Sequence, residues 1–103
     1  MITPFQRSVY EICKQVPAGK VTTYKAVGEA LGIKGYRAVG MALHRNPFAP
    51  DVPCHRVVTS DGGIGGFAFG VEKKIEMLRK EGVIVRGGLV VGFEEKLYLF
   101  KSR

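Results

Sequence analysis

The chain has 103 residues and a hydrophobic fraction of 46%, which fit a single globular domain and exclude an enzyme with its active site between two domains. Lysine and arginine number 16 against 9 acidic residues, and the resulting charge of +7 favours nucleic acid as partner, although charge alone also serves solubility. With no signal peptide and no apolar stretch of about 20 residues, we expect a cytoplasmic protein that does not associate with membranes.

The first predicted helix begins at Thr3 and Pro4, an N-cap and first-turn pair, and ends before the terminator 17–19. Its apolar residues recur at helical spacing, namely Phe5, Val9, Ile12, Cys13 and Val16. Because Cys13 lies on this apolar face, we expect it to be a buried structural thiol.

Two further predicted helices, 24–31 and 34–45, are separated by a turn at Gly32 and form a helix-turn-helix candidate. Thr22 or Thr23 is expected to cap the first of them. The core face of the second is expected to hold Tyr36, Val39, Gly40 and Leu43. Its expected exposed face alternates basic and small residues, namely Lys34, Arg37, Ala38, Met41, Ala42 and Arg45. Such a face allows close approach to a phosphate or a base, and an ordinary solvated face is the alternative interpretation.

The second half of the chain begins with a proline-rich segment, 46–53, that stiffens the approach to Cys54. A glycine-rich loop, 62–70, leads to a fourth predicted helix, 71–81, followed by Gly82. The residues expected to point inward from this helix are Val71, Ile75 and Leu78. The tail, 83–100, is predicted to form a small hairpin or wing. The predicted fold class is therefore mainly α, a winged-helix-like helix-turn-helix domain with a small β element.

Cys54 is a candidate nucleophile, because it follows a rigid loop and precedes His55 and Arg56, conditions that favour the thiolate. A chance dipeptide is the alternative, since neighbouring side chains usually point in different directions. Glu81 is unusual because a carboxylate in the last helical turn opposes the helix dipole. We expect it either to orient His55 in a relay or to be an exposed carboxylate offset by its basic neighbours.

A structural zinc site is not predicted, because the soft ligands lack the spacing of such sites. These ligands are Cys13, Cys54, His44 and His55. His44, near the end of its predicted helix, is accounted for by favourable placement in the helix dipole.

The segment Pro53-Cys54-His55-Arg56-Val57-Val58 resembles the active-site motif of the O6-alkylguanine-DNA alkyltransferases, also called methylated-DNA–protein-cysteine methyltransferases. Similar elements occur at 16–24, 36–40, 45–47 and 81–82, in family order and at family-like spacing. The resemblance implies one catalytic and DNA-binding domain over residues 1–103, with the family's N-terminal domain absent.

The resemblance also implies roles for five residues in the chemistry. Cys54 would accept the alkyl group from guanine O6 as a stable thioether, with no cofactor. His55 would act as base through water, Glu81 would orient His55, and Asn46 would fix the turn that carries Cys54. Tyr24 would donate a proton or a hydrogen bond to a guanine ring nitrogen.

In such proteins the second helix of the helix-turn-helix enters the minor groove of double-stranded DNA, and Arg37 would replace the flipped nucleotide in the stack. The other expected DNA contacts are Thr23, Lys34, Ala38, Met41, Ala42 and Arg45. The expected pocket wall comprises Pro53, Val57, Gly65, Gly66, Phe67 and Ala68. Some family members have tyrosine in place of Phe67 and serine in place of Ala68. The protein is expected to act as a monomer and without a metal.

Two other functions would account for parts of this sequence. Non-catalytic alkyltransferase-like proteins flag the same lesions, but they replace the acceptor cysteine, commonly with tryptophan, whereas here Cys54 is present and tryptophan is absent. A helix-turn-helix regulator with an incidental thiol would read base edges in the major groove as a symmetric dimer. The small alanines expected on the recognition helix argue against the regulator.

Overall fold

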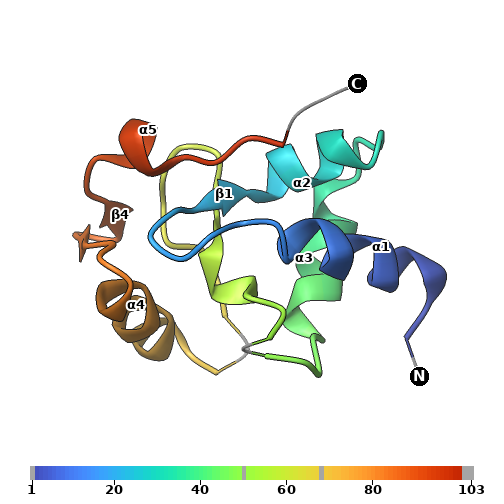
Figure 1. Cartoon of the computed structure of the whole chain (residues 1–103), viewed down its shortest axis with the longest axis horizontal. Coiled ribbons are helices and arrows are strands. Elements are labelled where there is room, and N and C mark those ends of the chain that lie inside the picture. The colour runs from blue at the N-terminus through green and yellow to red at the C-terminus, as the bar shows by residue number, and fades with distance from the viewer. Residues whose placement is uncertain (1, 50, 68, 101–103) are drawn as a thin grey trace.

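The computed structural model describes residues 2–49, 51–67 and 69–100. Three helices, α1 (Pro4–Cys13), α2 (Tyr24–Ala30) and α3 (Tyr36–His44), pack against one another at one end of the molecule (Figure 1). Helix α4 (Val71–Lys80) and a small hairpin lie at the other end, and the segment that carries Cys54 runs between the two ends. The predicted fold class, mainly helical with a small β element, is confirmed.

Helix α1 begins where the sequence predicts, because Thr3 and Gln6 form a capping box. The Gln6 amide donates to Thr3 Oγ1 and the Thr3 amide donates to Gln6 Oε1, both at 3.0 Å. Cys13 is fully buried on the inner face of this helix, as predicted. Tyr10 is also buried, and its hydroxyl donates to the carbonyl of Ala42 at 2.7 Å, which joins α1 to α3.

The helix-turn-helix is formed by α2 and α3 (Figure 1). Of the two threonines considered, Thr23 is the N-cap of α2, since its Oγ1 accepts from the Ala26 amide at 2.9 Å. The two helices approach closely at Gly28, where a Cβ atom would lie 2.6 Å from the Tyr36 ring. Helix α3 is shorter than predicted, because Gly35 is its N-cap and Lys34 precedes it.

A parallel pair of two-residue strands, β1 (Thr22–Thr23) and β2 (Val57–Val58), was not predicted. Strands this short carry no periodic signal in the sequence. The pairing aligns Thr22 with Val57, so the start of α2 lies beside the segment that carries Cys54. Strand β2 directly follows a single 3₁₀ turn, η1 (Cys54–Arg56).

Helix α4 differs from the prediction in the residues that it buries. Val71 was expected to point inward but is 41% exposed, and Ile75 is only half-buried. Leu78 is buried as predicted, and the residue one turn before it, Lys74, is fully buried as well. Gly82 follows the helix in the left-handed region, with φ +90°, as predicted for the residue after a C-cap.

The predicted hairpin in the tail is formed by β3 (Val85–Arg86) and β4 (Leu89–Val90), which pair antiparallel. A short helix that was not predicted, α5 (Phe93–Lys96), follows the hairpin. Beyond it the chain returns to Val21, whose amide donates to the Lys96 carbonyl at 2.9 Å and whose carbonyl accepts from the Tyr98 amide at 2.7 Å.

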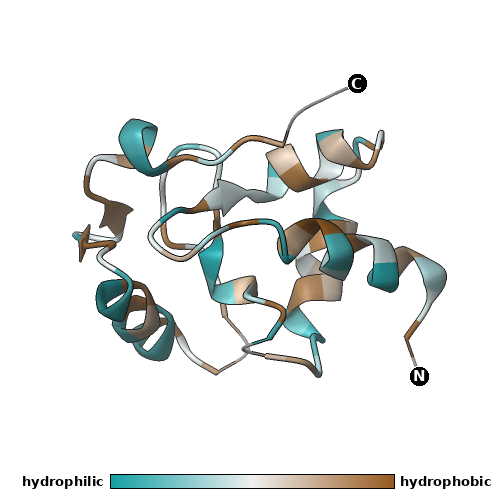
Figure 2. Cartoon of the chain, viewed as in Figure 1, coloured by the Kyte–Doolittle hydropathy of each residue, from teal (hydrophilic) through white to brown (hydrophobic). Residues whose placement is uncertain are grey.

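The buried hydrophobic residues form two clusters. The larger one lies among α1, α2, α3 and the Cys54 segment, and the smaller one joins Val21 and Val58 to α4 and the hairpin. Helix α3 contributes to the larger cluster and is largely hydrophobic, whereas α4 is mostly hydrophilic (Figure 2). None of the helices in the described ranges is long and apolar enough to cross a bilayer.

Candidate active site

Cys54 is fixed by the loop that precedes it. Its side chain is 6% exposed, and its amide donates to the Val52 carbonyl at 2.8 Å. The same carbonyl accepts from Asn46 Nδ2 at 2.9 Å, while Asn46 Oδ1 accepts from the Phe48 amide at 2.9 Å. Asn46 is itself buried, and its side-chain amide bonds to both ends of the loop segment 48–52, which sets the position of the cysteine.

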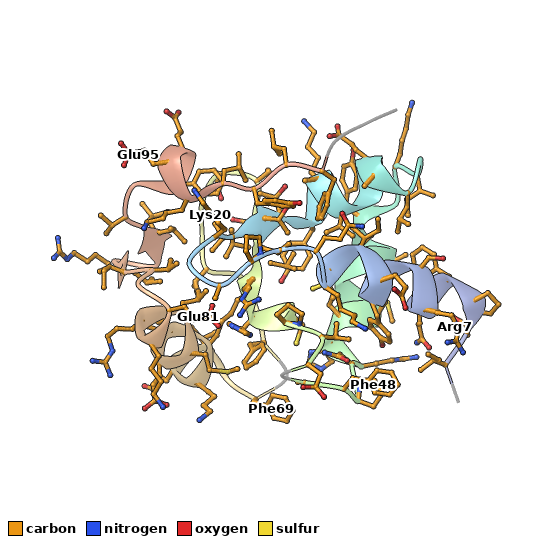
Figure 3. The ribbon with its side chains drawn as sticks, viewed as in Figure 1. Arg7, Lys20, Phe48, Phe69, Glu81 and Glu95 are labelled. Carbon is orange, nitrogen blue, oxygen red and sulfur yellow. The ribbon has the colours of Figure 1, made fainter. Side chains whose placement is uncertain are left out.

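His55, Arg56 and Glu81 form a hydrogen-bonded cluster behind Cys54. Glu81 Oε2 lies 3.0 Å from His55 Nε2, and both Glu81 oxygens accept from Arg56, at 2.9 Å from Nε and 2.6 Å from Nη2. Arg56 also donates from Nη1 to the Val16 carbonyl at 2.8 Å, which ties the cluster to the end of α1. In Figure 3 the Glu81 carboxylate points from the end of α4 toward the centre of the molecule.

The electrostatics of this cluster keep the imidazole neutral and the carboxylate ionised. Burial lowers the pKa of His55 from its usual value, against the opposing effect of Glu81. Burial acts to raise the pKa of Glu81, but hydrogen bonds from Arg56 and His55 outweigh it and hold that pKa low. An ionised Glu81 accepts a hydrogen bond from Nε2–H, so the lone pair of His55 is on Nδ1. That atom is buried and has no hydrogen-bond partner in the described part of the chain.

An enclosed cavity of about 100 Å³ lies in front of Cys54. Its lining residues come from α2, α3, η1 and the glycine-rich loop, and they are Tyr24, Gly40, Leu43, His44, Cys54, Gly66 and Phe67. A more open groove of about 570 Å³ shares Tyr24, Gly40 and His44 with this cavity. The groove follows the outer face of α3 and therefore leads to the cysteine.

Tyr24, the first residue of α2, lies between the groove and the cavity. Burial raises the pKa of its hydroxyl, with the nearby Cys54 acting in the same direction, so the hydroxyl retains its proton at neutral pH. A Cβ atom on Gly65 would lie 3.3 Å from this hydroxyl, and Gly65 has a φ of +70°. The loop therefore passes close to Tyr24 at a position suited to glycine.

The residues predicted to contact DNA fall into two groups. Arg37, Met41 and Arg45 line the groove, and Lys34 and Ala38 are exposed nearby in the chain. The prediction that Ala42 lies on the exposed face is wrong, because the residue is 3% exposed and belongs to the larger hydrophobic cluster. Thr23 is 6% exposed, and its hydroxyl is already engaged as the cap of α2. Neither side chain lies on the surface of the groove.

The residues predicted to form the pocket wall also divide. Gly66 and Phe67 line the cavity, and Gly65 lies against Tyr24. Pro53 and Val57 are buried within the motif, and neither lines the cavity. Ala68 lies outside the described residues.

Sequence reasoning missed four contributors to the site. Arg56 was assigned no role of its own, although it holds both oxygens of Glu81. His44 was attributed to the helix dipole and Gly40 to the core, yet both line the cavity and the groove. Lys74 was overlooked, although it lies four residues before the buried Leu78 and hence on the inner face of α4.

Fold and site together define a helix-turn-helix domain with an enclosed cysteine at the end of a groove along its second helix. The family described as 6-O-methylguanine DNA methyltransferase, DNA binding domain, matches residues 4–83, and the chain belongs to this family. A methylated-DNA–protein-cysteine methyltransferase of Saccharolobus islandicus is 48% identical over 80 residues, which cover 78% of this chain and 52% of that protein. The chain thus spans about half the length of the methyltransferases that it matches.

The solved structures similar to this fold include two proteins of different length. The O6-methylguanine-DNA methyltransferase of Pyrococcus kodakaraensis has a TM-score of 0.74 and 48% identity, over 80% of this chain and 48% of that one. An ATL protein of S. pombe in complex with DNA has a TM-score of 0.80 and 27% identity, over 95% of this chain and 98% of that one. The match covers about half of the Pyrococcus protein but nearly all of the S. pombe protein.

Proposed function

We propose that this protein repairs O6-alkylguanine in double-stranded DNA by transferring the alkyl group irreversibly to its own Cys54. The observation that carries the proposal is the position of Cys54, buried at the end of the α3 groove and followed directly by a histidine bonded to a partly buried carboxylate. The similarity to a methylated-DNA–protein-cysteine methyltransferase supports the same activity.

The proposed reaction is a single displacement. His55 Nδ1 takes the Cys54 proton through a bridging water, and Glu81 stabilises the imidazolium that forms. The thiolate attacks the alkyl carbon, a carbon–sulfur bond forms, and the carbon–oxygen bond breaks with its electron pair leaving on the guanine. Tyr24 donates to a ring nitrogen of the departing base. This displacement needs no cofactor.

Enclosure of Cys54 requires the damaged nucleotide to leave the DNA stack. A base within a duplex cannot enter a cavity whose reactive side chain is only 6% exposed. We propose that α3 enters the minor groove, that Arg37 fills the space left by the flipped nucleotide, and that Lys34 and Arg45 contact phosphates. The protein would act as a monomer in the cytoplasm, with binding that weakens as salt increases.

A second candidate is damage recognition without transfer. It is supported by the similarity to the ATL protein, which extends over nearly the whole of both chains. In that case the cavity would hold the flipped base while Cys54 stays unmodified. The two functions share the groove and the cavity and differ only in the fate of the thiol.

The test is to incubate the protein with a short duplex that carries O6-methylguanine and to measure its intact mass. We expect a gain of one methylene unit, which peptide digestion maps to Cys54, and no gain for Cys54→Ser. Tight lesion-specific binding of the wild-type protein without any gain in mass would support damage recognition instead.

A further inference from the structure

Lys74 is a buried cation for which the proposed chemistry has no use. Its side chain is fully buried in α4, and its Nζ donates to the carbonyls of Val57 at 2.7 Å and Gly66 at 3.0 Å. No carboxylate in the described ranges forms an ion pair with it. Burial lowers its pKa to about 8, which reflects how unfavourable the charge is in this position.

A buried lysine is unexpected at a position where an apolar residue would pack without the cost of removing a charge from water. What a lysine adds here is a donor that reaches two carbonyls at once. A methionine of similar length would fill the same space but would leave both carbonyls without this partner. The two hydrogen bonds are therefore the feature of Lys74 that an apolar side chain does not supply.

The two carbonyls belong to two different segments near the site. Val57 begins β2, directly after the turn that holds Cys54, whereas Gly66 lines the cavity in the glycine-rich loop. Glycine loops are conformationally free, and Gly62 and Gly65 already adopt positive φ. The Nζ also lies 5.9 Å from the centroid of the Tyr24 ring, so the same side chain borders a third element of the site.

We propose that Lys74 is a positioning residue that fixes the Gly66–Phe67 wall to β2 and thereby sets the width of the cavity in front of Cys54. The inference rests on the proposed function, because the width of the cavity matters for a guanine base. Without this bond the loop would sample wider conformations, and the base would be held less firmly against the thiol.

The experiment compares Lys74→Met with Lys73→Met, its neighbour on α4. Lys73 is exposed and pairs with Glu76 at 3.5 Å, so this control removes the same charge without reaching the site. Two reagents distinguish an effect on the pocket from an effect on the reactivity of the thiol. Free O6-benzylguanine must occupy the cavity to react, whereas iodoacetamide alkylates the thiol without needing a guanine site. Intact mass follows both reactions.

For Lys74→Met we expect the second-order rate constant with O6-benzylguanine to fall by about tenfold or more, since displacements of about 1 Å cost up to about 10²-fold. The iodoacetamide rate is expected to change little, and Lys73→Met should match the wild type in both reactions. A parallel fall in both rates would contradict the proposal, because Lys74 would then act on the thiol. Unchanged benzylguanine kinetics in a folded Lys74→Met protein would equally overturn it.

A second variant and a second measurement cover the case in which Lys74→Met does not fold. Lys74→Gln keeps a neutral donor group on a shorter side chain, and amide hydrogen exchange over residues 62–67 reports the loop directly. We expect faster exchange in that segment of Lys74→Gln but not in α1, and unchanged exchange there would overturn the inference. If the wild-type protein gains no mass with either O6-benzylguanine or the methylated duplex, the proposed function fails. The exchange data would still test whether Lys74 holds the loop to β2.

Discussion

The two ends of the molecule contribute to the site in different ways. Residues 2–49, the recognition half, form the groove and most of the cavity wall from the side chains of α2 and α3. Residues 69–100, the support half, supply none of the described residues that line the cavity. Instead they reach the site from behind through two charged side chains, Lys74 and Glu81. The surface that would meet the substrate is thus separate from the groups that tune and position the reactive segment.

This separation implies that substitutions in the two halves should affect different measurements. Changes at the groove should alter binding and reaction on DNA, and changes in the support half should alter the reaction of Cys54 with a bound base without altering the groove.

The largest effect is expected for Glu81→Gln in the support half. The substitution removes the charge that stabilises a protonated His55 and leaves Arg56 without its carboxylate partner. Because general-base catalysis contributes about 10²–10⁴-fold, we expect the alkylation rate to fall by at least about 10²-fold with duplex affinity retained. Single-turnover mass spectrometry and a binding titration measure the two quantities.

Glu76→Gln is the matched control, since Glu76 lies on the same helix and pairs only with the exposed Lys73 among the described residues. It should leave both rate and affinity at wild-type values. A normal alkylation rate in folded Glu81→Gln would remove Glu81 from the relay and with it the proposed role of the support half.

Arg37→Ala tests the recognition half and is expected to have the next largest effect. Arg37 is exposed and lines the groove, so its loss should slow repair of a methylated duplex by about tenfold, the size of one lost specific contact. Reaction with free O6-benzylguanine, which requires no DNA, should change little. Arg79→Ala removes the same charge from the exposed face of α4 and should leave both reactions unchanged. Equal losses in the two reactions of Arg37→Ala would exclude a role in nucleotide flipping.

The recognition half was also the more predictable half from sequence. Its helix ends depend on local signals such as the Thr3–Gln6 capping box and Gly32, which act within a few residues of the chain. The exception, Ala42, shows the limit of such signals. An alanine fits either an exposed or a buried face, and only the packing of Tyr10 against α3 decides between them.

The support half was less predictable for two physical reasons. Lys74 occupies an apolar position of α4, and its partners are backbone carbonyls, which have no signature in the sequence. The two-residue strands and the four-residue helix α5 are too short to show a period. The unusual position of Glu81 in its helix left two interpretations open, and the family resemblance favoured the relay with His55. Glu81 follows His55 by 26 residues, and no local signal in that stretch indicates that the two meet.

The smallest expected effect is on stability, and it tests the buried histidine that bonds to Glu81 of the support half. Burial lowers the pKa of His55 in the folded protein below the value of about 6.5 in an unfolded chain. As the pH falls from 7.5 to 5.5, the unfolded chain therefore binds this proton before the folded protein does, and the free energy of unfolding decreases. One proton contributes at most about 1.4 kcal/mol per pH unit.

Urea unfolding at the two pH values measures the decrease. His55→Gln should reduce it, and His44→Gln, at an exposed position, should preserve it. If wild type and His55→Gln lose the same stability on acidification, His55 is not held neutral by burial. The contrast between a buried cluster of His55, Arg56 and Glu81 and an open groove would then not hold.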